Sequence, residues 1–120
     1  MIDHLNLPVR DLARSARFYA AALAPLGAGV VAESPESVGL GRPDAPQIWL
    51  APAAEVPALH LAFVAADRAA VRRFHAAALA AGATDHGAPG LRADYSPTYY
   101  AAFVRDPDGH NIEAVCHRAE

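Results

Sequence analysis

Apolar and polar residues alternate at the start of the chain, and this alternation gives way to helical spacing after residue 11. Over residues 2–9 the aliphatic side chains fall on one face of an extended chain, while His4 and Asn6 fall on the other. Asp11 is placed to cap a helix that runs to about Ala24. The apolar stripe that we expect to be buried on this helix comprises Leu12, Ala16, Tyr19 and Leu23.

Three short apolar segments follow the helix, and turns that contain proline separate them. One turn contains Ser34-Pro35 and the other contains Arg42-Pro43-Asp44. The pattern therefore predicts strands over residues 28–32, 37–41 and 47–51.

The same succession of elements then returns, with His60 following His4 by 56 residues (60 − 4). Asp67 corresponds in the same way to Asp11, and such a repeat indicates one structural unit used twice. We expect Asp67 to cap a second helix that runs to about Ala81, with Val71, Phe74, Ala78 and Leu79 inward. The remaining predictions are strands over residues 59–65, near 83–86, over 99–104 and over 111–116, with an irregular segment over 87–98.

Together the two copies predict an α+β fold in one domain of residues 1–120. Each copy is a βαβββ module, the first over about residues 1–54 and the second over about 57–118. One module has too few elements to bury both faces of its sheet. We therefore expect the two modules to form one curved, partly closed mixed sheet with the helices outside.

The composition narrows the class of partner. Just over half of the residues are apolar, so the chain can bury a core. The net charge of −3, without a basic cluster, argues against nucleic acid, and no apolar run approaches the ~20 residues of a membrane span. Cys116 is the only cysteine and no secretory signal is visible, so we expect a cytoplasmic protein that acts on small molecules.

Three candidate metal ligands fall on one predicted face. Aliphatic neighbours suit the face that a helix covers, which leaves His4 and His60 on the opposite, concave face. Ile112 and Ala114 likewise leave Glu113 on the concave face. Two imidazoles and one carboxylate form a site for a divalent first-row metal (Fe, Mn, Ni, Zn or Co) that keeps positions open for a substrate.

Each of these residues also has a purely structural interpretation. A histidine in an apolar strand is commonly a hydrogen-bonded core residue, and a glutamate at a strand end is commonly solvated. Aligning the turns at residues 42–44 and 105–107 sets Trp49 opposite Glu113, so the first copy carries an indole where the second carries a carboxylate. That alignment leaves three protein ligands and makes Trp49 a candidate wall of the pocket.

Two segments resemble the vicinal oxygen chelate superfamily, which includes glyoxalase I, the extradiol dioxygenases and the fosfomycin and bleomycin resistance proteins. Residues 4–12, with Ser15 and Phe18-Tyr19, are similar to the first strand and helix of the family, and residues 103–113 are similar to its closing hairpin. The resemblance implies a glyoxalase-like fold of paired modules that commonly dimerises. It also implies metal ligation by His4, His60 and Glu113.

The resemblance implies a metal-dependent lyase or isomerase, dioxygenase or thiol transferase that acts on a small molecule with adjacent oxygens. Glyoxalase I uses a fourth protein ligand, which would fall near Trp49. A metal-free protein that sequesters a planar compound is the alternative, and its cleft could be lined by Trp49, Tyr99, Tyr100 and Phe103. A domain that serves only assembly is a third. His4 can meet His60 of its own chain or of a neighbour. The candidate substrate-binding residues are Trp49, Arg92, Tyr95, Tyr100, Phe103 and His110.

Overall fold

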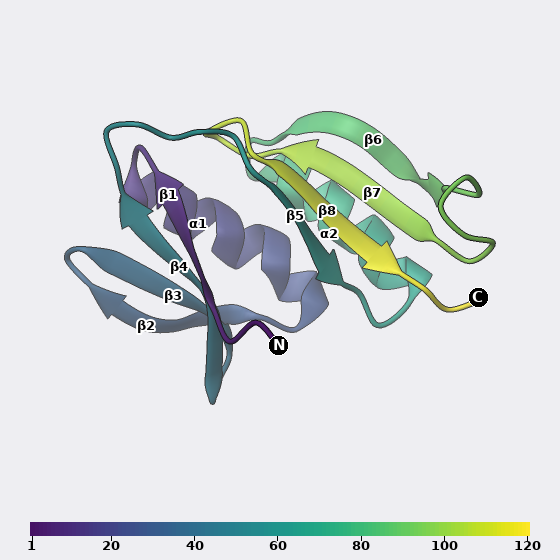
Figure 1. Cartoon of the computed structure of the whole chain (residues 1–120), viewed down its shortest axis with the longest axis horizontal. Helices are drawn as coiled ribbons and strands as arrows, with labels where there is room; N and C mark the ends of the chain where they lie inside the picture. The colour runs from purple at the N-terminus through teal and green to yellow at the C-terminus, as the bar shows by residue number, and fades with distance from the viewer.

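The computed structural model describes all 120 residues, and its elements occur in the predicted order (Figure 1). In the first module they are β1 (Leu5–Val9), α1 (Leu12–Leu23), the 3-10 turn η1 (Ala24–Leu26), β2 (Gly29–Ser34), β3 (Ser37–Arg42) and β4 (Ala45–Pro52). In the second they are β5 (His60–Val64), α2 (Arg68–Ala80), β6 (Thr84–Leu91), β7 (Tyr100–Arg105) and β8 (Asn111–Cys116). No helix is long and apolar enough to cross a membrane.

The strands form two separate four-stranded sheets with the same topology. Their strand orders are β1-β4-β3-β2 and β5-β8-β7-β6. The first and last strands of each module pair in parallel, and the other pairs are antiparallel. The α+β class and the repeated βαβββ unit are therefore confirmed. The expected single sheet is not continuous within the chain, because β1 and β5 are edge strands of different sheets.

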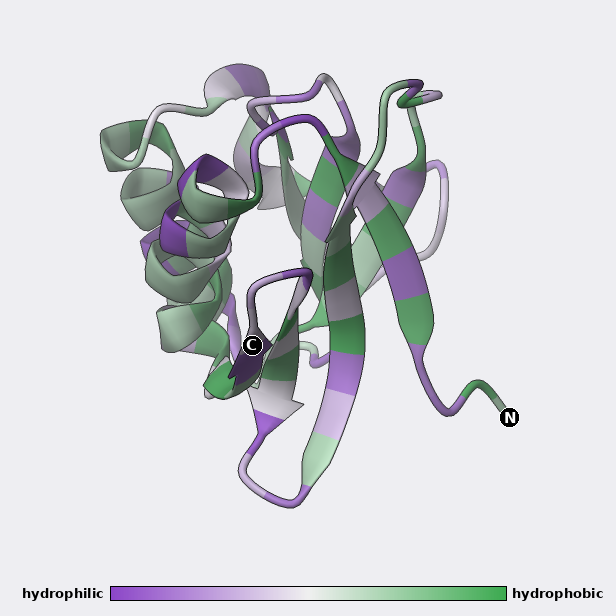
Figure 2. Ribbon diagram, turned by 90° about the vertical axis from the view of Figure 1, so that its left-hand side faces the viewer, coloured by the Kyte–Doolittle hydropathy of each residue, from purple (hydrophilic) through white to green (hydrophobic).

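Both helices lie on the same side of the molecule. Figures 1 and 2 show α1 behind the first sheet and α2 behind the second, so the uncovered faces of both sheets look in one direction. The core lies between the helices and the sheets, with Leu7, Phe18, Phe74 and Ile112 buried in it. This layering decides which side chains stay available for a site, because alternate strand residues point away from the core.

The helices begin where the sequence predicts. Asp11 accepts a hydrogen bond from the backbone N–H of Arg14 at 3.1 Å, and Asp67 accepts one from Ala70 at 2.7 Å. The expected buried position of Leu79 is wrong, since this side chain is 37% exposed at the margin of the buried face. The residues that α2 buries are Ala70, Val71, Phe74 and Ala78.

Strand β6 is longer than expected and takes up part of the predicted irregular segment. It continues to Leu91 because its pairing with β7 shifts register between Asp85 and Gly87 and again between Gly87 and Gly90. Such β-bulges let glycine stay within a strand, and Gly87 has a φ of 154°. The segment without regular structure is therefore confined to residues 92–99.

Candidate metal centre and pocket

His60 and Glu113 lie side by side on the uncovered face of the second sheet. His60 opens β5, and Glu113 lies in the adjacent parallel strand β8. The Nε2 atom of His60 is 3.1 Å from Oε1 of Glu113. Ile112 and Ala114 are fully buried toward α2, so the alternation of β8 places Glu113 on the uncovered face, as the sequence predicts.

Glu113 is only 2% exposed although no helix covers it. Tyr99 lies over the carboxylate and donates a hydrogen bond from its hydroxyl to Oε2 of Glu113. Burial and the neighbouring Glu113 raise the pKa of Tyr99 from 10.0 to about 12. Both oxygens of Glu113 therefore have a partner, one in His60 and one in Tyr99.

A pocket of about 390 Å³ surrounds this pair, lined by His60, Tyr95, Tyr99, Phe103, Asn111 and Glu113. The rings of His60 and Phe103 are stacked with centroids 6.2 Å apart. Asn111 lies opposite His60 in the register of β5 and β8, and its buried Oδ1 atom has no hydrogen-bond partner. The pocket thus combines aromatic walls with an imidazole, a carboxylate and an unpaired amide oxygen.

The donor atoms of this pocket fit a divalent first-row metal. Imidazole nitrogen and carboxylate oxygen are ligands that these metals accept together. A buried carboxylate is costly without a positive partner, and no arginine lies within 4.0 Å of Glu113, whose only ion-pair partner is His60. The Oδ1 atom of Asn111 is a polar atom of the same pocket that has no protein partner.

The third predicted ligand, His4, does not join His60 and Glu113 within one chain. His4 precedes β1 and does not line their pocket. Its Nδ1 atom is 2.6 Å from Oδ1 of Asp3 at the surface. Because Leu5 and Leu7 pack toward the core, His4 belongs to the uncovered face of the first sheet. The structure brings together two of the three predicted ligands.

Trp49 occupies in the first sheet the place that Glu113 occupies in the second. Trp49 pairs with Asn6 of β1, and Glu113 pairs with Ala62, which is the repeat counterpart of Asn6. The predicted equivalence of the two positions is therefore confirmed. The indole lies flat over Gly39, where a Cβ atom would be only 2.9 Å from the ring.

A model of the Glyoxalase/Bleomycin resistance protein/Dioxygenase superfamily matches residues 1–114. The chain belongs to this superfamily. Its fold agrees with solved structures of other members, and its paired βαβββ modules are the ones that the sequence resemblance implied.

Two solved structures illustrate this agreement. A glyoxalase/bleomycin resistance protein from Albidiferax ferrireducens T118 is 29% identical, with 97% of this chain and 98% of that chain covered and a TM-score of 0.83. A glyoxalase/bleomycin resistance protein/dioxygenase family enzyme from Burkholderia phytofirmans PsJN is 21% identical, with 98% of both chains covered and a TM-score of 0.78. No functionally curated protein matches the chain.

Of the other predicted substrate-binding residues, two line the pocket and one lies behind its wall. Tyr95 lines the pocket, and Phe103 forms its floor under His60. Arg92 lies over the ring of Phe103 at 5.3 Å and donates hydrogen bonds to the carbonyls of Ala88 and Gly90. Arg92 therefore supports the floor of the pocket and does not line it.

Tyr100 lies on the opposite face of the second sheet. It pairs in register with the buried Cys116 and packs against α2. The guanidinium of Arg68 is 5.0 Å from its ring centroid, and Arg72 donates a hydrogen bond to its hydroxyl at 3.2 Å. The structure therefore separates Tyr100 from the His60–Glu113 pocket.

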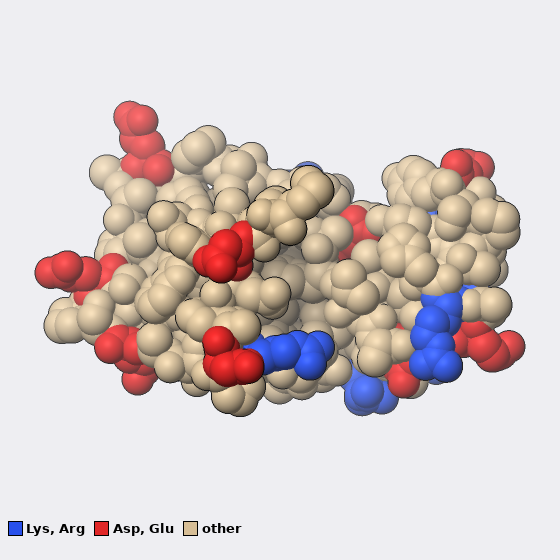
Figure 3. All heavy atoms as spheres, turned by 60° about the horizontal axis from the view of Figure 1, so that its bottom comes forward, with Lys and Arg blue, Asp and Glu red and all other residues tan.

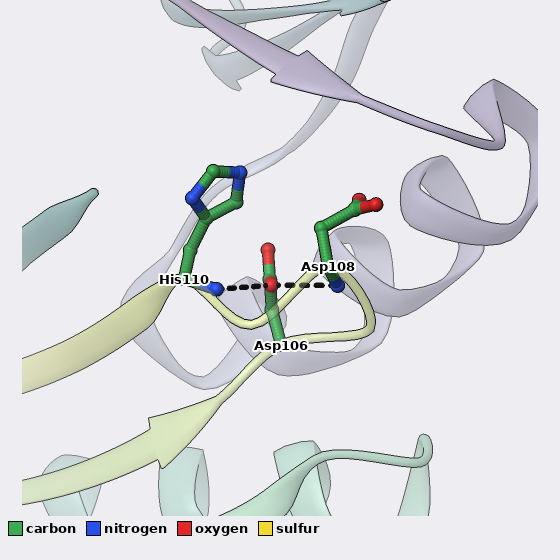
Figure 4. A group of neighbouring side chains, drawn as sticks. All are labelled: Asp106, Asp108 and His110. Atoms are coloured by element: carbon green, nitrogen blue, oxygen red, sulfur yellow. Dashed lines mark hydrogen bonds between the residues drawn. The ribbon is translucent and has the colours of Figure 1, made fainter. Parts of the chain in front are cut away.

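Asp106, Asp108 and His110 form a second group of close donor atoms, all within 4.8 Å of one another (Figure 4). The backbone N–H groups of Asp108 and His110 both donate to one oxygen of Asp106, and Tyr19 donates to the other. Asp108 accepts hydrogen bonds from Arg10 and from Ser15. The carboxylates are thus fully engaged in holding the turn between β7 and β8 against the first module.

His110 belongs to this structural group and not to the pocket. It is fully buried, and its Nδ1 atom accepts a hydrogen bond from the N–H of Leu59 at 3.0 Å. Nε2 must then carry the proton, which it donates to the carbonyl of Pro8 at 3.0 Å. With both nitrogens engaged, the imidazole links β1 to the start of β5 and is not available for a substrate.

Sequence reasoning missed one residue of the pocket, Asn111, and considered Tyr99 only as a wall of a metal-free cleft. Asn111 lies two residues before Glu113 in the same strand, so the alternation that identified Glu113 also indicated Asn111. Tyr99 opens the strand predicted over residues 99–104 and lies just before the observed β7, and only its hydrogen bond to Glu113 was not predicted.

Proposed function

We propose that the protein is a metal-dependent enzyme that acts on a small molecule with two adjacent oxygens. The metal would be held by His60 and Glu113 of one chain and by His4 of a second copy. The observation that carries this proposal is the buried carboxylate of Glu113, whose only ion-pair partner is the imidazole of His60.

The arrangement of the two sheets favours a second copy over a rearrangement of one chain. The uncovered faces of the two sheets look in the same direction (Figure 2). His4, which precedes β1, does not line the pocket of His60 and Glu113 on the second sheet. A two-fold axis would set the uncovered face of the first sheet against that of the second sheet of a partner. Each dimer would then contain two equivalent sites, and Trp49 would face the Glu113 pocket.

The chemistry of such a centre follows from its donor atoms. His60 must be neutral and Glu113 ionised to act as ligands, so metal binding weakens in acid. A bound divalent ion such as Fe, Mn, Ni, Zn or Co acts as a Lewis acid that stabilises negative charge on a ligand oxygen. Tyr95 and Phe103 enclose the ligand beside the metal. Lyase or isomerase, dioxygenase and thiol transferase reactions all use this stabilisation.

The distribution of charge supports a small-molecule ligand. On the face shown in Figure 3, most of the surface is uncharged and the few basic side chains lie near acidic ones, without forming a large basic patch. The net charge of −3 also disfavours nucleic acid. A single buried cysteine suits a reducing compartment, and we place the enzyme in the cytoplasm.

Metal titration of chelator-treated protein tests the proposal. Calorimetry with Co²⁺ is expected to give about one ion per chain, and His60→Ala and Glu113→Ala are each expected to abolish this binding. His86→Ala, at an exposed histidine of β6, is the matched control and is expected to bind normally. Stoichiometric binding that survives both pocket substitutions would refute the assignment.

A second function, metal-free sequestration of a planar compound, is favoured by one specific observation. The indole of Trp49 lies flat on Gly39 and offers a stacking surface on an uncovered sheet face. Quenching of Trp49 fluorescence by an aromatic compound, equal with and without chelator, would support this function. Quenching that requires metal would support the enzyme instead.

A further inference from the structure

Tyr99 holds the oxygen of Glu113 that does not face His60. Its hydroxyl donates to Oε2, while His60 lies against Oε1. A carboxylate can bind a metal through one oxygen or through both. The phenol therefore competes with the metal for Oε2 and leaves Oε1 as the oxygen directed at the metal position beside His60.

The phenol is fixed in this position by its surroundings. The ring of Tyr99 makes edge contacts with Tyr95 and His117, with centroids 5.0 and 5.3 Å away. The backbone of Tyr99 accepts a hydrogen bond from Arg92 at 2.7 Å and donates one to Ser96 at 3.3 Å. A hydroxyl held by both ring and backbone contacts has little freedom to leave Glu113.

We infer that Tyr99 is a positioning residue that keeps Glu113 a one-oxygen ligand and so preserves coordination positions for a substrate that binds through two oxygens. This inference rests on the proposed metal centre. Partners of metal ligands commonly set ligand orientation, and their loss changes affinity by about tenfold or more. Without the hydroxyl, the second oxygen of Glu113 is free to occupy a position that the substrate needs.

Tyr100 provides a control for the loss of one hydroxyl. It is the next residue along the chain, but it lies on the opposite face of the sheet, and its hydroxyl accepts a hydrogen bond from Arg72 and makes none to Glu113. Tyr99→Phe and Tyr100→Phe each keep the aromatic ring. Equal melting temperatures of the two variants and the wild type establish that the fold is retained.

The experiment uses Co²⁺ as the metal and acetohydroxamate as a probe that chelates through two oxygens. In Tyr99→Phe we expect the visible absorption bands of bound Co²⁺ to shift and acetohydroxamate to bind about tenfold more weakly. Tyr100→Phe, outside the pocket, is expected to match the wild type in both measurements. If either the Co²⁺ absorption bands or the affinity for acetohydroxamate is unchanged in Tyr99→Phe, Tyr99 does not have the proposed positioning role.

Two other results would refute the metal centre itself. Either the wild-type protein binds no Co²⁺, or the His60→Ala protein binds Co²⁺ as well as the wild type does. In that case the proposed function fails, and the role of Tyr99 fails with it. Loss of binding in His60→Ala, together with an unchanged Tyr99→Phe, refutes only the positioning role.

Discussion

The hydroxyl of Tyr19 donates a hydrogen bond to the buried carboxylate of Asp106 and so joins α1 of the first module to the β7–β8 turn of the second. Tyr19→Phe leaves one oxygen of that carboxylate unpaired. We expect the free energy of unfolding to fall by about 1–3 kcal/mol, as measured by urea denaturation. Tyr95→Phe, which removes an exposed hydroxyl, is the control. Equal stability of Tyr19→Phe and the wild type would contradict this link.

His110 provides a second connection between the modules, through Leu59 and Pro8. His110→Ala removes both hydrogen bonds and leaves a cavity, so we expect a loss of about 2–5 kcal/mol in unfolding free energy. Metal uptake by the folded fraction is expected to remain at the wild-type level, because His110 is not a ligand in the proposed centre. Loss of metal binding without loss of stability would mean that His110 has been assigned to the wrong role.

Gly39 sets the position of the indole on the first sheet. A Cβ atom at this residue would be 2.9 Å from Trp49, so Gly39→Ala must displace the ring. We expect a loss of about 1–3 kcal/mol in stability and a shift in tryptophan fluorescence. Gly29→Ala is the control, since nothing lies within 4 Å of its added Cβ. Identical spectra for Gly39→Ala and the wild type would show that Trp49 does not rest on Gly39.

Tyr99 makes stability depend on pH in the alkaline range. Its pKa is about 12 in the folded protein, raised by burial and by Glu113 from 10.0. Between these values the unfolded chain has lost a proton that the folded chain retains, so stability falls as the pH rises. The contribution of Tyr99 is therefore present below pH 10.0 and is lost by about pH 12. Tyr99→Phe is expected to flatten this part of the curve of unfolding free energy against pH, and an unaltered curve would speak against the raised pKa.

Sequence patterns predicted the faces of strands well because each strand is covered on one side only. The alternation around Glu113 placed its side chain on the uncovered face, and the repeat placed Trp49 in the equivalent position. Both Asp11 and Asp67 were identified as N-caps because a side-chain acceptor before a helix satisfies a free N–H group. These features depend on residues that are near each other in sequence or in the repeat.

Features that depend on how the modules pack were not predictable. Nothing in the local pattern of β1 indicates that its uncovered face belongs to a different sheet from the face that carries Glu113. The sequence therefore left open whether His4 meets His60 of its own chain or of a neighbour. The bulges of β6 were not predicted, because glycines such as Gly87 and Gly90 are as typical of turns as they are of irregular strands. The hydrogen bond of Tyr99 to Glu113 likewise depends on tertiary packing, which the alternation of a predicted strand does not specify.

The shared metal centre is tested most directly by mixing two defective chains. His4→Ala and Glu113→Ala proteins are each expected to bind no Co²⁺ when alone. When they are refolded together in equal amounts, half of the dimers are mixed and each mixed dimer contains one complete site. We predict that about a quarter of wild-type binding returns, because one of the two sites in half of the dimers is intact. No recovery of binding, in a mixture whose wild-type counterpart binds Co²⁺, would contradict a centre built from two chains.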